Sequence, residues 1–253
     1  EYVLLGGLWW KLLGKKVFLW RNHYAGSWLT DIASFFCDKI FCTSKHSYTA
    51  QYKKTVLMPV GADLNIFRHD ANLSRMPRST PFLGRVTPSK RPDVFIEALW
   101  ILRQRDVSFI ATVCGPSLMN DGHFAKKLRE RVNELGITES VSFVDGVSHD
   151  ATSIVYASHE VFVDLSRSGM YNKTLFEAAA SGCLVISMSD DFNAHVDSHL
   201  SFDGTAEDLA DTIEKIFLLP VVERVNIIDD LQTFATANSL HKWGERVVSE
   251  MYI

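Results

Sequence analysis

Short apolar runs alternate with longer amphipathic segments along most of this chain. Buried strands that flank a single short helix form a βαβ unit, and the strands of such a unit lie parallel in the sheet. Parallel sheets bind ligands beyond the carboxyl ends of their strands. The clearest repeat comprises, in chain order, an apolar run at 161–165, a polar turn at 166–172, a helix at 173–180, a stop at Gly182 and a second apolar run at 184–187.

The polar turn 166–172 is predicted to lie at this binding edge. A helix that opens directly after such a turn presents free backbone N–H groups and the positive end of its dipole, which favour an anionic group such as a phosphate. Glu177 follows on the second turn of that helix. An acid at this place suits the hydroxyls of a ribose or a sugar, although a solvated helix residue explains Glu177 equally well.

The other segments predict an α/β protein made of two Rossmann-like, doubly wound parallel units. We expect a partial first domain at 1–68, a polar linker at 69–80, a complete second domain at 81–235 and a helix at 236–253 that packs back on the first domain. The first domain is expected to be incomplete at its N-terminal side. Strands are predicted at 16–20, 39–43, 55–59, 82–83, 108–114, 141–144 and 200–202, and helices at 1–13, 27–37, 92–105, 121–135, 150–157, 206–218 and 221–253.

Composition excludes several classes of protein. A hydrophobic content of 47% with 22% charged residues is that of a globular chain rather than a disordered one. The formal net charge of -4 and pI near 6.1 provide no basic surface, so a nucleic acid is not expected as a partner. The four cysteines lack paired spacing and are expected to be buried free thiols of a reducing compartment.

The first twenty residues are apolar but are interrupted by Lys11, Lys15 and Lys16. No uninterrupted run reaches the roughly 18 residues that a membrane span requires. We favour a packed helix with its lysines in water, in a cytoplasmic protein. The alternative is a peripheral contact of Trp9, Trp10 and the lysines with the inner membrane face.

Three cations follow the apolar run that ends at Gly84. Arg85, Lys90 and Arg91 lie within seven positions at the mouth of the next helix. Converging Arg and Lys side chains can hold a diphosphate through charge-assisted hydrogen bonds, although a cation cluster by itself is more often a solvated loop. Gly115 and Val144 end two further strands, where a base or a sugar could approach the backbone.

His23 follows the strand predicted at 16–20, beside Arg21 and Asn22. A lone histidine is more often structural than catalytic, but its place at the end of a strand also favours a functional role for His23. The nine histidines show no spacing that predicts a metal site. The chain also lacks the Walker, GxGxxG and GxSxG motifs.

The ordered motifs resemble the retaining GT-B glycosyltransferases of the group 1 (family 4) type. The resemblance covers roughly 16–252. It implies two Rossmann-like domains that face each other across a cleft, of which 81–235 would be the nucleotide-sugar-binding domain. It also implies a nucleotide-diphosphate sugar as donor, and no metal or other cofactor. The motifs are Pro59-Val-Gly61-Ala-Asp63 with Phe67, Gly84-Arg85 with Lys90, Gly115-Pro116, and Glu177-Ala-Ala-Ala-Ser-Gly182-Cys-Leu-Val.

The resemblance also implies roles for individual residues. Arg85 and Lys90 would bind the donor's diphosphate, Glu177 the ribose hydroxyls, and His23 the donor sugar near the reacting carbon. The chain departs from the family at Gly169, where a first glutamate is common; Asn172 and Lys173 would replace its contacts. The catalytic residues would then be His23, Arg85 and Lys90, and the donor-binding residues Gly84, Arg85, Lys90, Gly115, Val144, Gly169, Met170, Asn172, Lys173, Thr174 and Glu177.

The sequence therefore predicts a hexosyltransferase that moves a sugar from a nucleotide-diphosphate donor to an acceptor hydroxyl with retention of configuration. Arg85 and Lys90 would stabilise the charge that develops on the departing diphosphate. The expected acceptor is a glycan or a lipid-linked molecule, as in polysaccharide biosynthesis. The alternatives are a nucleotide-sugar epimerase on the same fold and an inactive fragment or subunit that only binds a nucleotide sugar.

Overall fold

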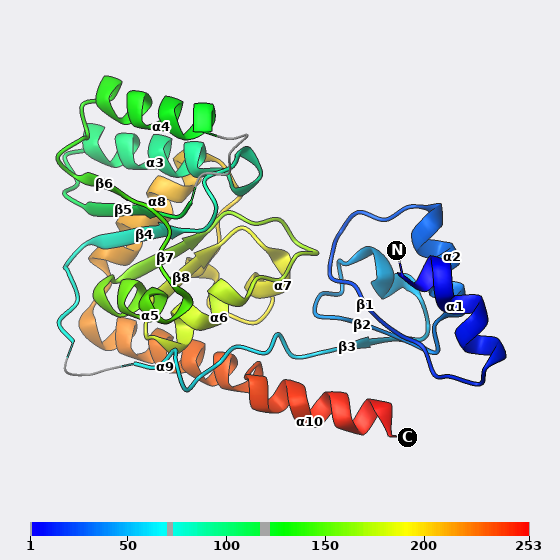
Figure 1. The fold of residues 1–253 in the computed structure, drawn as a ribbon. Helices are drawn as coiled ribbons and strands as arrows, with labels where there is room; N and C mark the ends of the chain where they lie inside the picture. The colour runs from blue at the N-terminus through cyan, green and yellow to red at the C-terminus, as the bar shows by residue number, and fades with distance from the viewer. Residues whose placement is uncertain (1, 70–72, 117–121, 253) are drawn as a thin grey trace.

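The computed structural model describes residues 2–69, 73–116 and 122–252. They form two α/β units that lie beside each other (Figure 1). The first unit extends from the N-terminus through strand β3, and the second begins at strand β4. All strand pairs in the two units are parallel over the described residues, as the alternating pattern of the sequence predicts.

The first unit is a three-stranded sheet in the order β1-β2-β3 with two helices packed together beside it. Gly7 lets these helices approach closely, because a Cβ atom there would lie 2.8 Å from Cβ of Phe36. Its small core is built on Val17, Cys37 and Ile40. The elements are α1 (Tyr2–Leu12), β1 (Phe18–Trp20), α2 (Trp28–Phe36), β2 (Lys39–Cys42), the 3₁₀ helix η1 (Tyr48–Gln51) and β3 (Thr55–Leu57).

The sheet of the second unit has two hydrogen-bonded parts. The strands β4 (Ser79–Leu83), β5 (Ile110–Cys114) and β6 (Val141–Val144) form one part, and β7 (Val161–Asp164) and β8 (Leu184–Ser187) form the other. β4 lies beside β7, so the spatial order is β6-β5-β4-β7-β8. The reversal of strand order between β4 and β7 is the switch point at which doubly wound sheets bind ligands.

Helices cover both faces of this second sheet (Figure 1). The helices α3, α4 and α8 pack on one face, and α5, α6 and α9 pack on the other. Short strands buried on both faces explain the continuous apolar runs of the sequence. The helices are α3 (Pro92–Gln104), α4 (Gly122–Glu134), α5 (His149–Ser158), α6 (Lys173–Ala180), α7 (Asp190–Asn193), α8 (Ala206–Leu218) and α9 (Val221–Ala237), with 3₁₀ helices η2 (Pro88–Lys90) and η4 (Ser198–Leu200).

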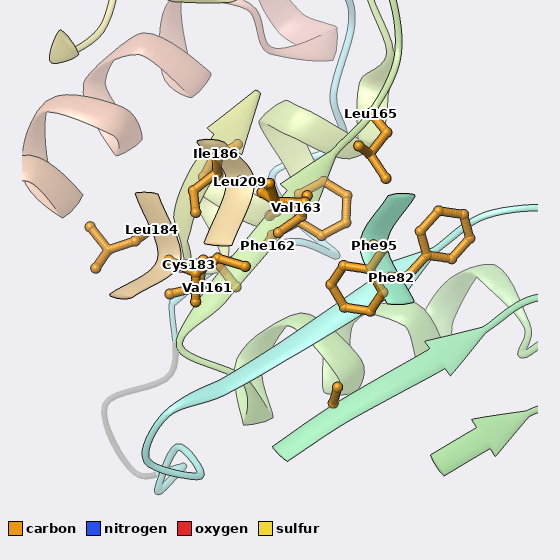
Figure 2. Packing of buried hydrophobic residues seen from close by; sticks show 14 of the residues in the cluster. Phe82, Phe95, Val161, Phe162, Val163, Leu165, Cys183, Leu184, Ile186 and Leu209 are labelled. Atoms are coloured by element: carbon orange, nitrogen blue, oxygen red, sulfur yellow. The ribbon is translucent and has the colours of Figure 1, made fainter. Parts of the chain in front are cut away.

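The main hydrophobic core lies in the second unit. Figure 2 shows Phe162 and Val163 of β7 beside Phe82 of β4 and Phe95 of α3. The rings of Phe82 and Phe95 lie 6.0 Å apart, and the ring of Tyr156 meets Phe162 edge-on at 5.3 Å. This packing fixes the strand ends from which the polar loops project.

The last helix, α10 (Leu240–Met251), leaves the second unit and runs along the first (Figure 1). Its Trp243 ring lies 6.1 Å from the ring of Trp20 in β1. Lys39 of β2 donates to a carboxylate oxygen of Glu250 at 2.9 Å. The C-terminal helix therefore contacts both units.

Several expected elements differ from the structure. Residues 200–202 were expected to form a strand, but Ser198–Leu200 is a 3₁₀ helix, and only Ser201 forms an isolated bridge, with Ser187. Two apolar residues are too few to hold a strand at the edge of the sheet. β4 is longer than expected and begins at Ser79. The helix expected at 221–253 is divided at Asn238 into α9 and α10.

The apolar first segment forms α1, one side of which packs on α2. Lys11 pairs with Asp38 at 2.9 Å, whereas Leu5 and Trp9 are exposed. None of the helices in the described part of the chain is long and apolar enough to cross a membrane.

Candidate active-site cleft between the two units

A cleft of about 650 Å³ lies where the two units meet. The loop after β1 supplies one wall, and the loops after β4 and β7 supply the other. These loops follow the carboxyl ends of their strands, where parallel sheets place ligand sites. The lining residues are Asn22, His23, Tyr24, Arg85, Pro88, Ser89, Lys90, Arg91, Arg167, Met170, Tyr171 and Asn172.

Four cations line this cleft, and no Asp or Glu is present among the described residues that line it. Arg91 is already engaged, because its guanidinium donates to the carbonyl of Gly204 at 2.7 Å and contacts the sulfur of Met188 at 3.2 Å. Arg85 and Arg167 are exposed and form no hydrogen bond or ion pair with any described residue. The cleft is therefore suited to an anionic ligand.

Lys90 is held beside a buried acid at the end of β7. Burial raises the pKa of Asp164, and the charge of Lys90 together with hydrogen bonds from Ser166 and Asn172 partly offsets this effect. The amide of Asn172 donates to Asp164 at 3.2 Å, and the ammonium of Lys90 lies 3.4 Å from the hydroxyl oxygen of Ser166. These contacts position Lys90 at the cleft without neutralising it by a direct ion pair.

The loop between β7 and α6 is fastened to the first unit at Gly169. Its backbone N–H donates to Asp191 at 2.8 Å, and the hydroxyl of Ser44 donates to the same carboxylate oxygen at 2.6 Å. Gly169 has a φ of +86°, and a Cβ atom there would lie 2.7 Å from Cβ of Tyr24 and 2.8 Å from the carbonyl oxygen of His46. Residues of the first unit therefore occupy the space that a glutamate side chain at position 169 would need.

His23 extends from the first unit into the cleft, at the end of the loop after β1. The Nδ1 atom accepts a hydrogen bond from the backbone N–H of Ala25 at 2.9 Å, and the ring stacks on Tyr24 with 4.6 Å between centroids. Because Nδ1 is an acceptor here, Nε2 is the nitrogen left to contact a ligand.

Glu177 is buried on α6, so it is not a solvated helix residue. Burial raises the pKa of its carboxyl group, and the charges of His149 and Lys173 partly counter this rise. No hydrogen bond reaches the carboxylate from any residue that the structure describes. A buried carboxylate without a protein partner is suited to accept hydrogen bonds from ligand hydroxyls.

The structure brings together five of the expected site residues and places the others outside the lining of the cleft. His23, Arg85, Lys90, Met170 and Asn172 line it. Gly115 instead allows a close crossing of the chain, because a Cβ atom there would lie 1.7 Å from the carbonyl oxygen of Gly84. The residues that do not line the cleft are Gly84, Gly115, Val144, Gly169, Lys173, Thr174 and Glu177.

Four contributors were missed from the sequence: Asp164, Asp191, Arg167 and Tyr24. Asp164 ends an apolar strand, and its side chain is recognised as a partner of Lys90 only in the fold. Arg167 and Tyr24 belong to no motif that we identified. Their position after the end of a predicted strand was the indication in the sequence that they could reach a ligand. In the described part of the chain, no cluster of three or more His, Cys, Asp or Glu side chains could hold a metal ion.

Solved structures with this fold include glycosyltransferases. HepE from Anabaena, in complex with UDP, aligns with a TM-score of 0.83 and 15% identity over 98% of this chain and 75% of its own. Sucrose-phosphate synthase from Thermosynechococcus elongatus aligns with a TM-score of 0.74 and 19% identity over 98% of this chain and 70% of its own. These alignments confirm the GT-B fold that the sequence predicts.

Curated relatives match part of the chain. A D-inositol 3-phosphate glycosyltransferase from Salinispora arenicola is 32% identical over 109 residues, 42% of this chain and 24% of the relative. The mannosylfructose-phosphate synthase of Agrobacterium fabrum is 26% identical over 165 residues, 58% of this chain and 36% of the relative. The matches thus span about a quarter to a third of these relatives' lengths. The family described as glycosyl transferases group 1 matches residues 65–230, and this chain therefore belongs to the group 1 glycosyltransferases.

Proposed function

We propose that this chain binds a nucleotide-diphosphate sugar in the cleft between its units and transfers the sugar to an acceptor hydroxyl with retention of configuration. One observation carries the proposal. Free cations from the second unit and His23 from the first line the same cleft of about 650 Å³. This arrangement supports a site for a diphosphate and its attached sugar between the two units.

The proposed chemistry is electrostatic. Arg85 and Lys90 hold the diphosphate and stabilise the negative charge that grows as the bond to the sugar breaks. His23 contacts the sugar. The acceptor hydroxyl oxygen bonds to the sugar on the face from which the diphosphate departs, and the hydroxyl proton passes to the departing diphosphate oxygen. The two cations supply the positive charge that a metal ion would supply in other transferases, so we propose that no metal is needed.

Glu177 lies outside the lining of the cleft, and we propose that it holds the ribose of a donor that extends beyond this lining. Its buried carboxylate gains hydrogen bonds when the ribose hydroxyls arrive, which offsets the cost of its burial. The solved structures of HepE contain UDP or UDP-glucose, which supports a nucleotide sugar as the donor here. The proposed acceptor is a glycan or a lipid-linked molecule that presents a free hydroxyl.

Isothermal titration with UDP, GDP, ADP and their sugars tests the donor site. We expect one nucleotide to bind, and Arg85→Ala or Lys90→Ala to weaken it about 10- to 100-fold through loss of a charge-assisted hydrogen bond. Arg103→Ala is the matched control, because Arg103 is exposed near the end of α3 remote from the cleft. Unchanged affinity in both cleft variants would refute the assignment.

Analysis of the products distinguishes sugar transfer from epimerisation and from binding alone. Incubation with the donor alone should leave its sugar unchanged, whereas an epimerase would convert it. With an acceptor present, the coupling constant of the anomeric proton should show the same configuration in product and donor. An inverted linkage would contradict retention, and binding without any turnover would indicate a nucleotide-sugar-binding protein.

A further inference from the structure

A second hollow of about 810 Å³ adjoins the candidate active-site cleft. Tyr24, Arg91 and Arg167 line both, so the two spaces are continuous around these side chains. The second hollow is lined by the apolar side chains of Met188 and Phe202 together with polar and charged side chains. A ligand whose one end reaches the sugar in the cleft can therefore extend past Arg167 into this hollow.

Two carboxylates and two guanidinium groups line the second hollow, and three of these four side chains form hydrogen bonds with neutral groups of the described chain. Asp203 accepts from the backbone N–H and the hydroxyl of Thr205 at 2.7 and 2.6 Å, and the hydrogen bonds from Thr205 lower the pKa of Asp203. Asp190 accepts from the hydroxyl of Ser168 at 3.1 Å. Arg91 is occupied by the carbonyl of Gly204. Among the charged side chains that line this hollow in the described part of the chain, only Arg167 forms no hydrogen bond with a described residue.

The donor's diphosphate does not account for Arg167. The proposed site already assigns Arg85 and Lys90 to the diphosphate, and Arg167 approaches from the loop after β7, on the side that opens to the second hollow. Like charges around one space repel each other, and an anion between them relieves this repulsion. A guanidinium has the planar geometry that binds a phosphate or a carboxylate through two parallel hydrogen bonds.

We propose that the second hollow is the acceptor subsite, and that the acceptor carries a phosphate or a carboxylate which Arg167 binds. This inference rests on the proposed glycosyltransferase function. The exposed ring of Tyr24, stacked on His23, lies between the two spaces and provides a flat surface for the acceptor's sugar ring. Arg167 is thereby a specificity-determining residue that distinguishes charged acceptors from neutral ones.

Calorimetry in the presence of a saturating concentration of the best-binding nucleotide tests this assignment. Glucose 6-phosphate and glucuronate serve as anionic probes, and glucose is the neutral counterpart. We expect either anionic probe, or both, to bind more tightly than glucose, and Arg167→Gln to weaken that binding about 10- to 100-fold while nucleotide affinity is kept. Arg103→Gln, an exposed arginine away from the cleft, is the control and should change neither affinity.

The outcomes distinguish this inference from the proposed function. Nucleotide binding together with equal affinity for glucose and both anions would overturn the anionic acceptor and leave the donor site intact. An effect of Arg167→Gln on the nucleotide, or competition between nucleotide and probe, would assign Arg167 to the donor site and overturn the inference as well. Failure of every nucleotide to bind would refute the proposed function and the acceptor subsite with it.

Discussion

Glu177 is a buried carboxylate without a hydrogen-bond partner among the described residues, and burial raises its pKa. The folded protein therefore holds this proton more tightly than the unfolded chain. As the pH rises from the ordinary carboxyl range through the raised pKa, the free energy of unfolding falls. Glu177 thus lowers stability at neutral pH, as is common for groups kept for ligand binding.

Glu177→Gln should raise the melting temperature at pH 7, because the amide carries no charge to bury. The gain should vanish below about pH 4, where the wild-type carboxyl is protonated in both states. Thermal unfolding of both proteins, measured from pH 3 to pH 8 at intervals of about one pH unit, gives this difference. Glu223→Gln on the exposed face of α9 is the control. A gain that persists unchanged at low pH would contradict the explanation.

Gly169 occupies a left-handed conformation against the first unit. Gly169→Ala should lower the free energy of unfolding by about 2 kcal/mol or more, because the new methyl group has both an unfavourable φ and a close contact with Tyr24. Urea unfolding measures the change. Gly244→Ala in α10, where a Cβ atom meets nothing within 4 Å, should instead be stabilising by about 0.5–1 kcal/mol. Equal effects at the two sites would argue against the strain.

At the scale of elements, α10 fastens the first unit to the second. Trp243 lies against Gly61 and Trp20, and Lys39 binds Glu250. Trp243→Ala should cost about 2 kcal/mol of packing and increase hydrogen exchange in β1 and β2, with little change in the core strands β4 and β7. Leu218→Ala is the control, because that side chain is exposed at the end of α8. Unchanged exchange in β1 would show that α10 is not the fastening element.

Element bounds were predictable where the sequence contains strong stop signals. Gly182 separates α6 from β8, and the sequence places both elements at their observed bounds, as it does for α8, which begins after the cap residue Thr205. The strand predicted at 200–202 was wrong because Leu200 reaches the core from the end of a 3₁₀ helix and Phe202 reaches it from the irregular segment that follows. Burial alone does not distinguish these geometries from a strand.

The candidate site was predictable only in part, for a physical reason. The cations Arg85 and Lys90 are close in sequence and share one loop, so their convergence on the cleft was visible from the order of residues. The roles of Asp164 and Arg167 follow from contacts between loops and from the positions of the cavities, which the order of residues does not show. The tight fit of Gly169 against Tyr24 likewise joins positions far apart in the chain, which periodicity does not encode.

At the scale of the whole molecule, all four cysteines are buried free thiols, as the sequence predicts. Burial raises the pKa of Cys37, Cys42 and Cys114, and it raises that of Cys183 to about 11. Because the thiolate is the reactive form, a disulfide reagent at pH 8 should label none of the thiols rapidly in the native protein and all of them in guanidinium. Rapid labelling of one native thiol would contradict the burial at that position.

The two units hold unequal cores. The first rests on a small cluster around Val17, Cys37 and Ile40, whereas the second encloses a large one that spans both faces of its sheet. A small core provides less free energy of folding, so we expect the first unit of this chain to open before the second on heating. His23 lies on the first unit, whereas Arg85 and Lys90 lie on the second. We therefore expect warming to displace His23 from the cleft before it disturbs the two cations. Under the proposed function, turnover would disappear at a temperature where the cations still hold a nucleotide, and the protein would bind its donor without transferring the sugar.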